Sequence, residues 1–196
     1  MKLTLGPLES NCYLIFNRNS CLIIDPGSES NKILEALGDY DLVAIVLTHG
    51  HFDHIGAVKD LVKKYHCPIY ISPKDEILLH NPQYNYSYPN SITINHPVKL
   101  ITEKILVIGD YSFQIFPTPG HTAGSITLRY HDYLFTGDTL FQNDVGRTDL
   151  YSGSEIELSR SLKLLKKLPK KLEVLPGHGP NSTIKAELLS NPYLRD

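Results

Sequence analysis

A loop crowded with metal-ligand side chains follows a hydrophobic stretch, and this order limits the folds that are open to the chain. Residues 43–47 (VAIVL) are apolar and partly β-branched, which predicts a strand buried on both faces. His49 and His51 follow it two residues apart, so an extended backbone projects both side chains to the same side. Asp53 and His54 then begin an amphipathic helical pattern and leave the loop in another direction. One short loop can therefore supply ligands to two metal ions.

Three more residues of ligand type come later, each after a strand-like run: His121, Asp138 and His178. Imidazole nitrogens and carboxylate oxygens suit zinc or iron, and a closed structural zinc site uses only four ligands. The series of seven residues, four in the loop and three later, exceeds that number. It fits two ions that share one carboxylate, an arrangement in which the ions lie roughly 3.5–4 Å apart and activate water for hydrolysis.

The segments around these residues resemble the motifs of the metallo-β-lactamase superfamily. The resemblance covers nearly the whole chain and rests on residues 22–27 (LIIDPG), 48–54 (THGHFDH), 118–125 (TPGHTAGS), 135–141 (FTGDTLF) and 175–180 (LPGHGP). Within the superfamily, the chain is most similar to the short single-domain members of the glyoxalase II-like, or hydroxyacylglutathione hydrolase-like, branch. Residues 11–14 (NCYL) and 191–194 (NPYL) also resemble that branch.

The resemblance implies a role for each ligand. The first metal would be bound by His49, His51 and His121, the second by Asp53, His54 and His178, and Asp138 would bridge the two. Two zinc ions per chain are expected, with iron or manganese as alternatives in either site. Asp25 would accept a proton from a ligating histidine and so fix the tautomer of that ring.

The reaction that the resemblance implies is hydrolysis of a small-molecule thioester, S-(2-hydroxyacyl)glutathione or a related thiol ester. A hydroxide that bridges the two metals would attack the carbonyl carbon, and one metal would stabilise the resulting oxyanion. Asp53 would orient this nucleophile and hand its proton to the leaving group. A thiolate leaves readily, so the reaction needs no strong general acid.

The pattern of strands and helices predicts an α/β fold with a single domain over residues 1–196. Strands followed by helices occur twice along the chain, which indicates an αββα sandwich of two mixed β-sheets flanked by helices, as the resemblance also implies. Strands are expected at residues 3–5, 12–16, 21–24, 43–47, 68–71, 104–108, 111–116, 126–130, 133–135 and 172–175, and helices at 30–37, from 54, after 73, from 154 and at 182–189. Few residues follow His178, so we do not expect the C-terminal helical domain that completes the glutathione pocket of full-length glyoxalase II.

Charge and hydropathy exclude several classes of partner. The net charge of −2, with both signs interspersed, offers no basic field for nucleic acid. No apolar run approaches the ~20 residues that span a bilayer, and the N-terminus lacks a signal-peptide pattern. Cys12, Cys21 and Cys67 lie in apolar, strand-like surroundings and are expected to be buried free thiols of a reducing compartment. We therefore expect a cytoplasmic enzyme that acts away from membranes.

Arg147 is the candidate for substrate binding away from the metal ligands. It lies in residues 146–149 (GRTD), a short distance along the chain from Asp138, and a guanidinium suits a carboxylate. In glyoxalase II a Lys follows the corresponding Gly and binds the glutathione portion, so the resemblance aligns Arg147 with a substrate-binding position. An ion pair of Arg147 with Asp149 or Asp144 is the alternative.

Residues 81–97 are rich in Asn, Tyr and Pro without periodicity, which predicts a long loop. Long loops in small domains are often functional, so Tyr84, Tyr86 and Tyr88 either flank the substrate channel or pack the loop onto the body. The histidines outside the motifs are expected in surface or capping roles, and they are His66, His80, His96 and His131.

Other activities remain open within the same superfamily. A mononuclear iron persulfide dioxygenase would use only His49, His121 and Asp138, and its Gly-Arg-Thr-Asp segment resembles residues 146–149. Against it, the last ligand here lies in Pro-Gly-His-Gly-Pro, whereas those dioxygenases have Pro-Ala-His-Asp-Tyr. The missing basic charge disfavours a nuclease of this fold, and the complete ligand series disfavours a metal-binding module without activity.

Overall fold

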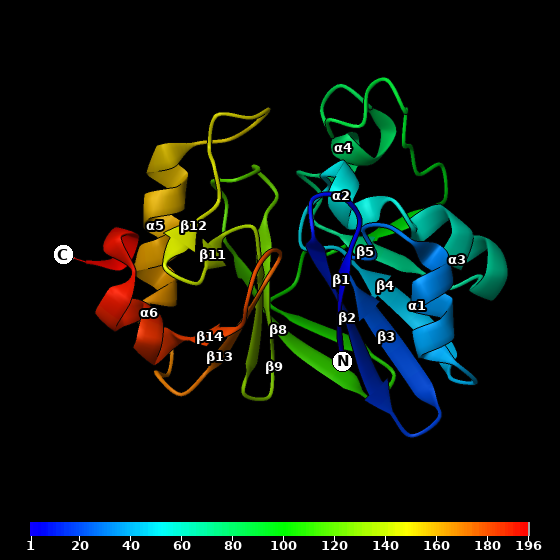
Figure 1. Ribbon diagram of the computed structural model, residues 1–196, viewed down its shortest axis with the longest axis horizontal. Coiled ribbons are helices and arrows are strands. Elements are labelled where there is room, and N and C mark those ends of the chain that lie inside the picture. The colour runs from blue at the N-terminus through cyan, green and yellow to red at the C-terminus, as the bar shows by residue number, and fades with distance from the viewer. Residues whose placement is uncertain (196) are drawn as a thin grey trace. The chain divides into compact units, whose positions relative to one another are not determined.

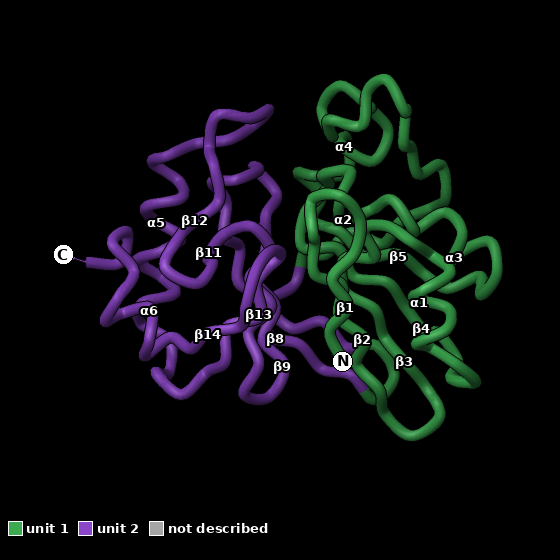
Figure 2. Tube along the Cα trace, viewed as in Figure 1, with its two compact units in different colours: residues 1–102, 108–110 green, residues 103–107, 111–196 purple. Residues whose placement is uncertain are grey.

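Each half of the chain is built around its own six-stranded sheet (Figures 1 and 2). The computed structural model describes residues 1–195. Unit 1 comprises residues 1–102 with 108–110, and unit 2 comprises residues 103–107 with the chain from 111 onward. The expectation of one domain over the whole chain stays a prediction.

The sheet of unit 1 starts with antiparallel strands and continues with parallel ones. Its order is β1 (Lys2–Leu5), β2 (Ser10–Asn17), β3 (Ser20–Ile24), β4 (Asp41–Val46), β5 (Ile69–Ile71) and β6 (Val98–Leu100), with parallel pairing from β3 onward. Its helices are α1 (Ser30–Leu37), α2 (Phe52–Ile55), α3 (Val58–Tyr65) and α4 (Glu76–His80). Parallel neighbours need crossover connections, and α1 joins β3 to β4 while α2 and α3 join β4 to β5. The loop at the carboxyl end of β4 therefore lies where α/β sheets usually bind ligands.

The sheet of unit 2 mixes antiparallel pairs with one parallel pair. Its order is β14 (Ser182–Thr183), β13 (Glu173–Pro176), β10 (Tyr133–Gly137), β9 (Ile126–Tyr130), β8 (Tyr111–Pro117) and β7 (Ile105–Ile108), and β10 pairs with β13 in parallel. The unit also contains a hairpin of β11 (Leu140–Phe141) and β12 (Asp144–Val145), helices α5 (Glu155–Leu165) and α6 (Ile184–Ser190), and the 3-10 turn η1 (Pro192–Leu194). Because β10 and β13 are parallel, their carboxyl ends lie at the same edge of the sheet.

The predicted α/β class, with two mixed sheets flanked by helices, is confirmed. The sequence missed the short strands β6, β11, β12 and β14, which have too few residues to show a period of two. The helix expected over 182–189 starts only after β14, because Thr183 caps it by accepting the backbone N–H of Ala186 at 3.1 Å. The helix expected from residue 54 is divided into α2 and α3.

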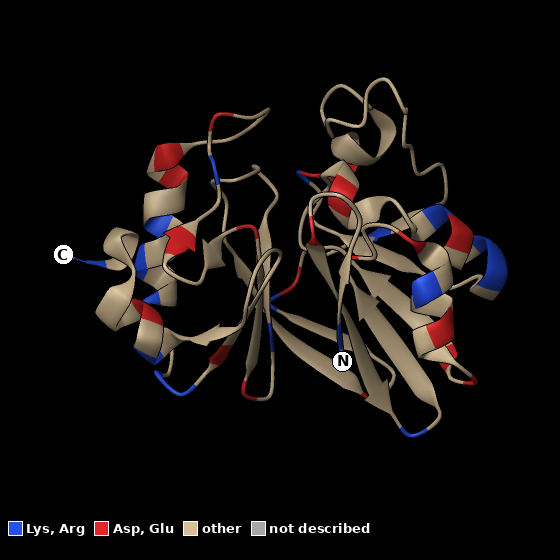
Figure 3. Ribbon diagram, viewed as in Figure 1, with Lys and Arg blue, Asp and Glu red and all other residues tan. Residues whose placement is uncertain are grey.

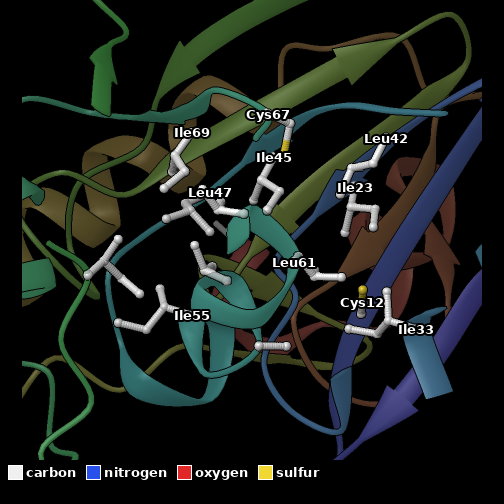
Figure 4. Close-up of a cluster of buried hydrophobic side chains, with 14 of the residues drawn as sticks. Cys12, Ile23, Ile33, Leu42, Ile45, Leu47, Ile55, Leu61, Cys67 and Ile69 are labelled. Carbon is white, nitrogen blue, oxygen red and sulfur yellow. The ribbon is translucent and has the colours of Figure 1, made fainter. Parts of the chain in front are cut away.

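Unit 1 buries one continuous apolar cluster between strands of its sheet and helices α1 and α3 (Figure 4). Ile23 of β3 and Ile45 of β4 belong to it, together with Ile33 of α1 and Leu61 of α3, and all four side chains are fully buried. Apolar burial of this extent is the main favourable contribution to folding. It holds the end of β4, and with it the ligand-bearing loop, in place.

The three cysteines are buried free thiols, as the sequence predicted. Burial raises the pKa of Cys21 to about 12 and that of Cys67 to about 11, and it also raises the pKa of Cys12. Thiols with such pKa values stay protonated near neutral pH and are poor nucleophiles.

The helices of both units carry mixed charge on their surfaces. Figure 3 shows Lys and Arg beside Asp and Glu on the helices of each unit. Such interspersed charge is usual for the polar faces of amphipathic helices. Across residues 1–195, no helix is both long enough and apolar enough to cross a bilayer.

Replacing Ile33 by Ala tests the packing of α1 in unit 1. Ile33 is fully buried, so its truncation leaves a cavity and should lower the free energy of unfolding by about 2–5 kcal/mol. Ile156→Ala is the matched control, because Ile156 also lies in a helix but is 67% exposed. For the control we expect a change within about 0.5 kcal/mol. Urea unfolding measures both variants, and equal losses would show that the burial of Ile33 does not decide the effect.

Candidate metal centre

The loop after β4 gathers three imidazole rings in unit 1. His49, His51 and His54 are buried, and the ring centroids are 4.8 Å apart for His49 and His51 and 4.2 Å apart for His49 and His54. Asp53 lies with them, and its Oδ2 is 3.5 Å from Nε2 of His54. Gathering such polar groups in a buried loop costs free energy unless they are compensated, and a bound cation would supply that compensation. We call these four residues the unit 1 ligand group.

Asp25, directly after β3, orients two of these rings. Its carboxylate accepts the backbone N–H of Thr48 at 2.8 Å and the hydroxyl of Thr48 at 2.5 Å, and it lies 3.1 Å from Nδ1 of His54. An ionised carboxylate only accepts, so Nδ1 of His54 carries the proton and Nε2 keeps its lone pair. Since Thr48 donates its hydroxyl hydrogen to Asp25, its oxygen accepts from Nδ1 of His49 at 3.1 Å. Both Nε2 atoms therefore present the lone pair that a metal ligand requires.

The first turn of α2, which carries Asp53, is fixed by close backbone packing. The hydroxyl of Ser10 donates to the carbonyl oxygen of Asp53 at 2.7 Å. Gly27 lies against the same carbonyl, and an added Cβ would be 1.6 Å from its oxygen, so only glycine fits there. A cavity of about 570 Å³ borders this turn, lined by the β1–β2 turn, the start of α1 and α2, and Asp53 forms part of its wall. A cavity of this size can hold a small organic ligand.

Unit 2 brings its three predicted ligands together. Asp138 directly follows β10, and its Oδ2 lies 3.5 Å from Nε2 of His121 and 3.5 Å from Nε2 of His178. Nδ1 of His121 donates to the backbone carbonyl of Arg147 at 2.8 Å, because a carbonyl only accepts, and the lone pair of His121 is therefore on Nε2. An added Cβ on Gly146 would be 1.8 Å from the carbonyl oxygen of Asp138, so this position also requires glycine. His121, Asp138 and His178 form the unit 2 ligand group, with one carboxylate between two imidazoles.

The guanidinium of Arg147 forms an ion pair with Asp149. Nε and Nη2 each donate to a carboxylate oxygen at 2.7 Å, and these bonds lower the pKa of Asp149 to about 2. This pair is one of the alternatives that the sequence left open, while Asp144 accepts the N–H of Val145 at 2.8 Å. The side chains of Arg147 and Asp149 are 63% and 66% exposed, so the pair contributes little to stability.

Supporting residues were missed by the sequence patterns. Thr48 links His49 to Asp25, and Gly146 leaves space for the backbone carbonyl of Asp138, yet their only signal was a place at the start of a motif. Of the histidines outside the motifs, His66 lies at the C-cap of α3. The exposed ones among them are His66, His80 and His131.

Comparisons with known proteins agree with this arrangement over nearly the full chain. A family model described as the metallo-beta-lactamase superfamily matches residues 5–178, a range that contains both ligand groups. A Haemophilus influenzae protein named hydroxyacylglutathione hydrolase GloC is 35% identical over 198 residues, which cover 95% of this chain and 93% of that protein. Two crystal structures are similar in fold. The structure of BLEG-1 B3 metallo-beta-lactamase has a TM-score of 0.95 at 37% sequence identity, and the match covers 100% of this chain and 99% of that chain. The structure of TTHA1623 in a di-iron-bound form has a TM-score of 0.90 at 36% sequence identity, and the match covers 99% of this chain and 100% of that chain.

Asp25→Asn tests the support of the His54 ring. The amide nitrogen of asparagine cannot accept a hydrogen bond, so the variant breaks part of the network and releases the tautomer of His54. We expect the affinity for zinc to fall about 10–100-fold, measured by competition with a chromogenic chelator. Asp132→Asn is the matched control, because Asp132 pairs with Lys171 on the surface. An Asp25→Asn protein with wild-type zinc affinity would contradict the role of Asp25.

Proposed function

The chain belongs to the metallo-β-lactamase superfamily, and from this we propose that it is a dinuclear metal-dependent hydrolase of thioesters. The proposed substrate is S-(2-hydroxyacyl)glutathione or a related thiol ester, a class supported by the relative named hydroxyacylglutathione hydrolase. One observation carries the proposal. Three imidazoles of the complete ligand series are already oriented for metal binding. In each of them Nδ1 is hydrogen-bonded to an oxygen, so Nε2 presents a lone pair; these residues are His49, His54 and His121.

The donors present fit the metals that we propose. Imidazole and carboxylate ligands suit zinc, iron and manganese, and two zinc ions are our first choice. We propose that the two ligand groups bind the same pair of ions. The first ion would be held by His49, His51 and His121, the second by Asp53, His54 and His178, and both by Asp138. The position of the Asp138 carboxylate, equally far from two imidazoles, suits a bridging ligand.

The chemistry divides between the metals and Asp53. Bound metal ions would lower the pKa of water and polarise the thioester carbonyl. The backbone of Asp53 is held by Ser10 and Gly27, so its carboxylate has a defined place from which to orient the attacking water. The same carboxylate would take the proton of that water and deliver it to the departing thiolate.

Arg147 is our proposed contact for a carboxylate of the thiol carrier. Its ion pair with Asp149 is exposed, so a substrate carboxylate can replace Asp149 without desolvating a buried charge. The role fits a substrate that is a small anionic molecule and requires neither nucleic acid nor a membrane. The buried free thiols are in keeping with a cytoplasmic protein, which is the compartment we propose.

Metal analysis combined with a thioesterase assay tests the proposed function. We expect two metal ions per chain and release of thiol from S-lactoylglutathione. Asp138→Ala should lower kcat/KM more than about 100-fold. Loss of a residue that only hydrogen-bonds to a metal ligand already lowers metal affinity or activity about 10–100-fold, and Asp138 is proposed to be a ligand itself. His131→Ala, at an exposed position, should leave both readouts unchanged.

Three outcomes would reject the proposal. One iron per chain at every loading, with oxygen-dependent consumption of a persulfide, would assign the dioxygenase activity. Hydrolysis of a β-lactam without hydrolysis of thioesters would assign a lactamase. Equal losses from Asp138→Ala and His131→Ala would contradict the ligand assignment.

Arg147→Ala tests carrier recognition, with Asp149→Ala as its matched variant. If Arg147 binds a substrate carboxylate, its removal should raise KM for an anionic thioester about tenfold and leave a small neutral ester unaffected. Asp149→Ala releases the guanidinium from its present partner, so KM for the anionic substrate should stay the same or fall. Equal effects of both variants on both substrates would show that the ion pair is structural.

A further inference from the structure

The loop that carries His51 is hydrogen-bonded to a later segment of the chain that contributes no candidate metal ligand. Oδ2 of Asp75 accepts the backbone N–H of Gly50 at 3.1 Å, and the backbone carbonyl of Asn85 accepts the N–H of Phe52 at 3.0 Å. These two N–H groups belong to the residues immediately before and after His51. Hydrogen bonds on both sides restrict the backbone torsions of His51, and its imidazole therefore has a restricted position.

The residues that make these bonds are themselves rigidly held. Asp75 and Asn85 are fully buried. The side-chain amide of Asn85 donates to the carbonyls of Leu78 at 2.8 Å and Ile92 at 2.9 Å, so it ties the end of α4 to the returning chain. Buried polar side chains with several hydrogen bonds are well ordered, because breaking any one bond leaves an unpaired group in the interior.

The approach of α4 to this loop requires the glycine between the two histidines. A Cβ added to Gly50 would be 2.6 Å from Cβ of Leu78 and 3.1 Å from the carbonyl oxygen of Asp75. The glycine in His-Gly-His therefore lets the start of α4 come within hydrogen-bond reach of the loop. It links the ligand motif to residues that lie well beyond it in the sequence.

Tyr86 completes this arrangement by contacting the imidazole directly. Its ring lies edge-on to that of His51, with centroids 5.6 Å apart and an interplanar angle of 74°. The backbone of Tyr86 is left-handed, with φ at 63°, an unusual conformation for an aromatic residue. Tyr88, two residues further on, is 71% exposed. Tyr86 thus packs on a candidate ligand, whereas Tyr88 is largely exposed.

We propose that Asp75, Asn85 and Tyr86 form a clamp that sets the position of His51 and thereby the affinity of the centre for metal. We call these three residues the 75–86 clamp. Asp75 and Asn85 act through the backbone on either side of His51, and Tyr86 acts through its ring, so all three are positioning residues. The inference rests on the proposed function in one respect, namely that His51 is a metal ligand. It assigns α4 and the residues on either side of it a role in assembling the centre.

Zinc affinity of the purified chain, measured by competition with a chromogenic chelator, tests the clamp. Asp75→Ala removes the acceptor for Gly50 and should lower the affinity about 10–100-fold, whereas Asp75→Asn keeps an acceptor oxygen and should restore most of it. Tyr86→Ala should also lower the affinity, and Tyr86→Phe, which keeps the ring, should not. Tyr88→Ala is the matched control from the same loop and should behave as the wild type.

Amide hydrogen exchange of the metal-free protein gives a second readout that needs no activity. Peptides over residues 48–54 should exchange faster in Asp75→Ala and at the wild-type rate in Tyr88→Ala. If Asp75→Ala does not fold, the comparison of Tyr86→Ala with Tyr86→Phe decides. Wild-type zinc affinity in both alanine variants, or an equal loss in Tyr88→Ala, would overturn the clamp.

Failure of the proposed function can be distinguished from failure of the clamp. A wild-type chain that binds zinc but releases no thiol from thioesters would reject the proposed function and leave the clamp test intact. A wild-type chain that binds no metal would reject the proposed function, and the exchange rates over residues 48–54 would still decide whether the clamp holds the loop.

Discussion

The carboxylate of Asp25 accepts three hydrogen bonds inside the protein, and the geometry of unit 1 depends on them. It joins the end of β3, the loop after β4 and the first turn of α2, three segments that the sequence separates. Because an ionised carboxylate cannot donate, it dictates where the protons of Thr48 and His54 lie, and through Thr48 that of His49. The backbone of Asp25 is left-handed, with φ at 51°, a conformation that Asp and Asn tolerate better than most residues. The position of Asp25 thus has a cost in backbone conformational energy.

In unit 2 a different kind of group fixes which nitrogen of a histidine carries the proton. Its acceptor for a histidine Nδ1 is the backbone carbonyl of Arg147, not an acid. A carbonyl is present whatever side chain a residue carries, so the support of His121 does not depend on the guanidinium of Arg147. The side chain is therefore available for the substrate contact that we propose, while the backbone orients His121. What this place does require is Gly146, because the carbonyl of Asp138 occupies the space of a side chain.

The candidate ligands that each unit groups together and the long strands could be predicted from the sequence, whereas the residues that support those candidates could not. His49 and His51 were recognisable because they follow a buried apolar run at a fixed interval, and the two histidines and the aspartate of unit 2 because they follow strand-like runs. Asp75 and Asn85 lie in polar stretches that look like ordinary surface, and only the fold shows that they are buried and bonded to the loop. Strands of two or three residues carry no periodic signal, and they form because an existing sheet edge pairs with them. Whether Arg147 would pair with Asp149 depended on local rotamers that spacing alone does not determine.

The buried cysteines have a consequence for the proposed hydrolysis of thioesters. A thiolate on the protein would attack the thioester carbonyl and take the acyl group while the carrier thiolate leaves, and this event would modify the enzyme itself. Burial keeps Cys12, Cys21 and Cys67 out of contact with solvent and raises their pKa values, so the fraction present as thiolate near neutral pH is very small. The apolar core thereby protects the protein from self-acylation while it shapes the sheet that carries the ligands.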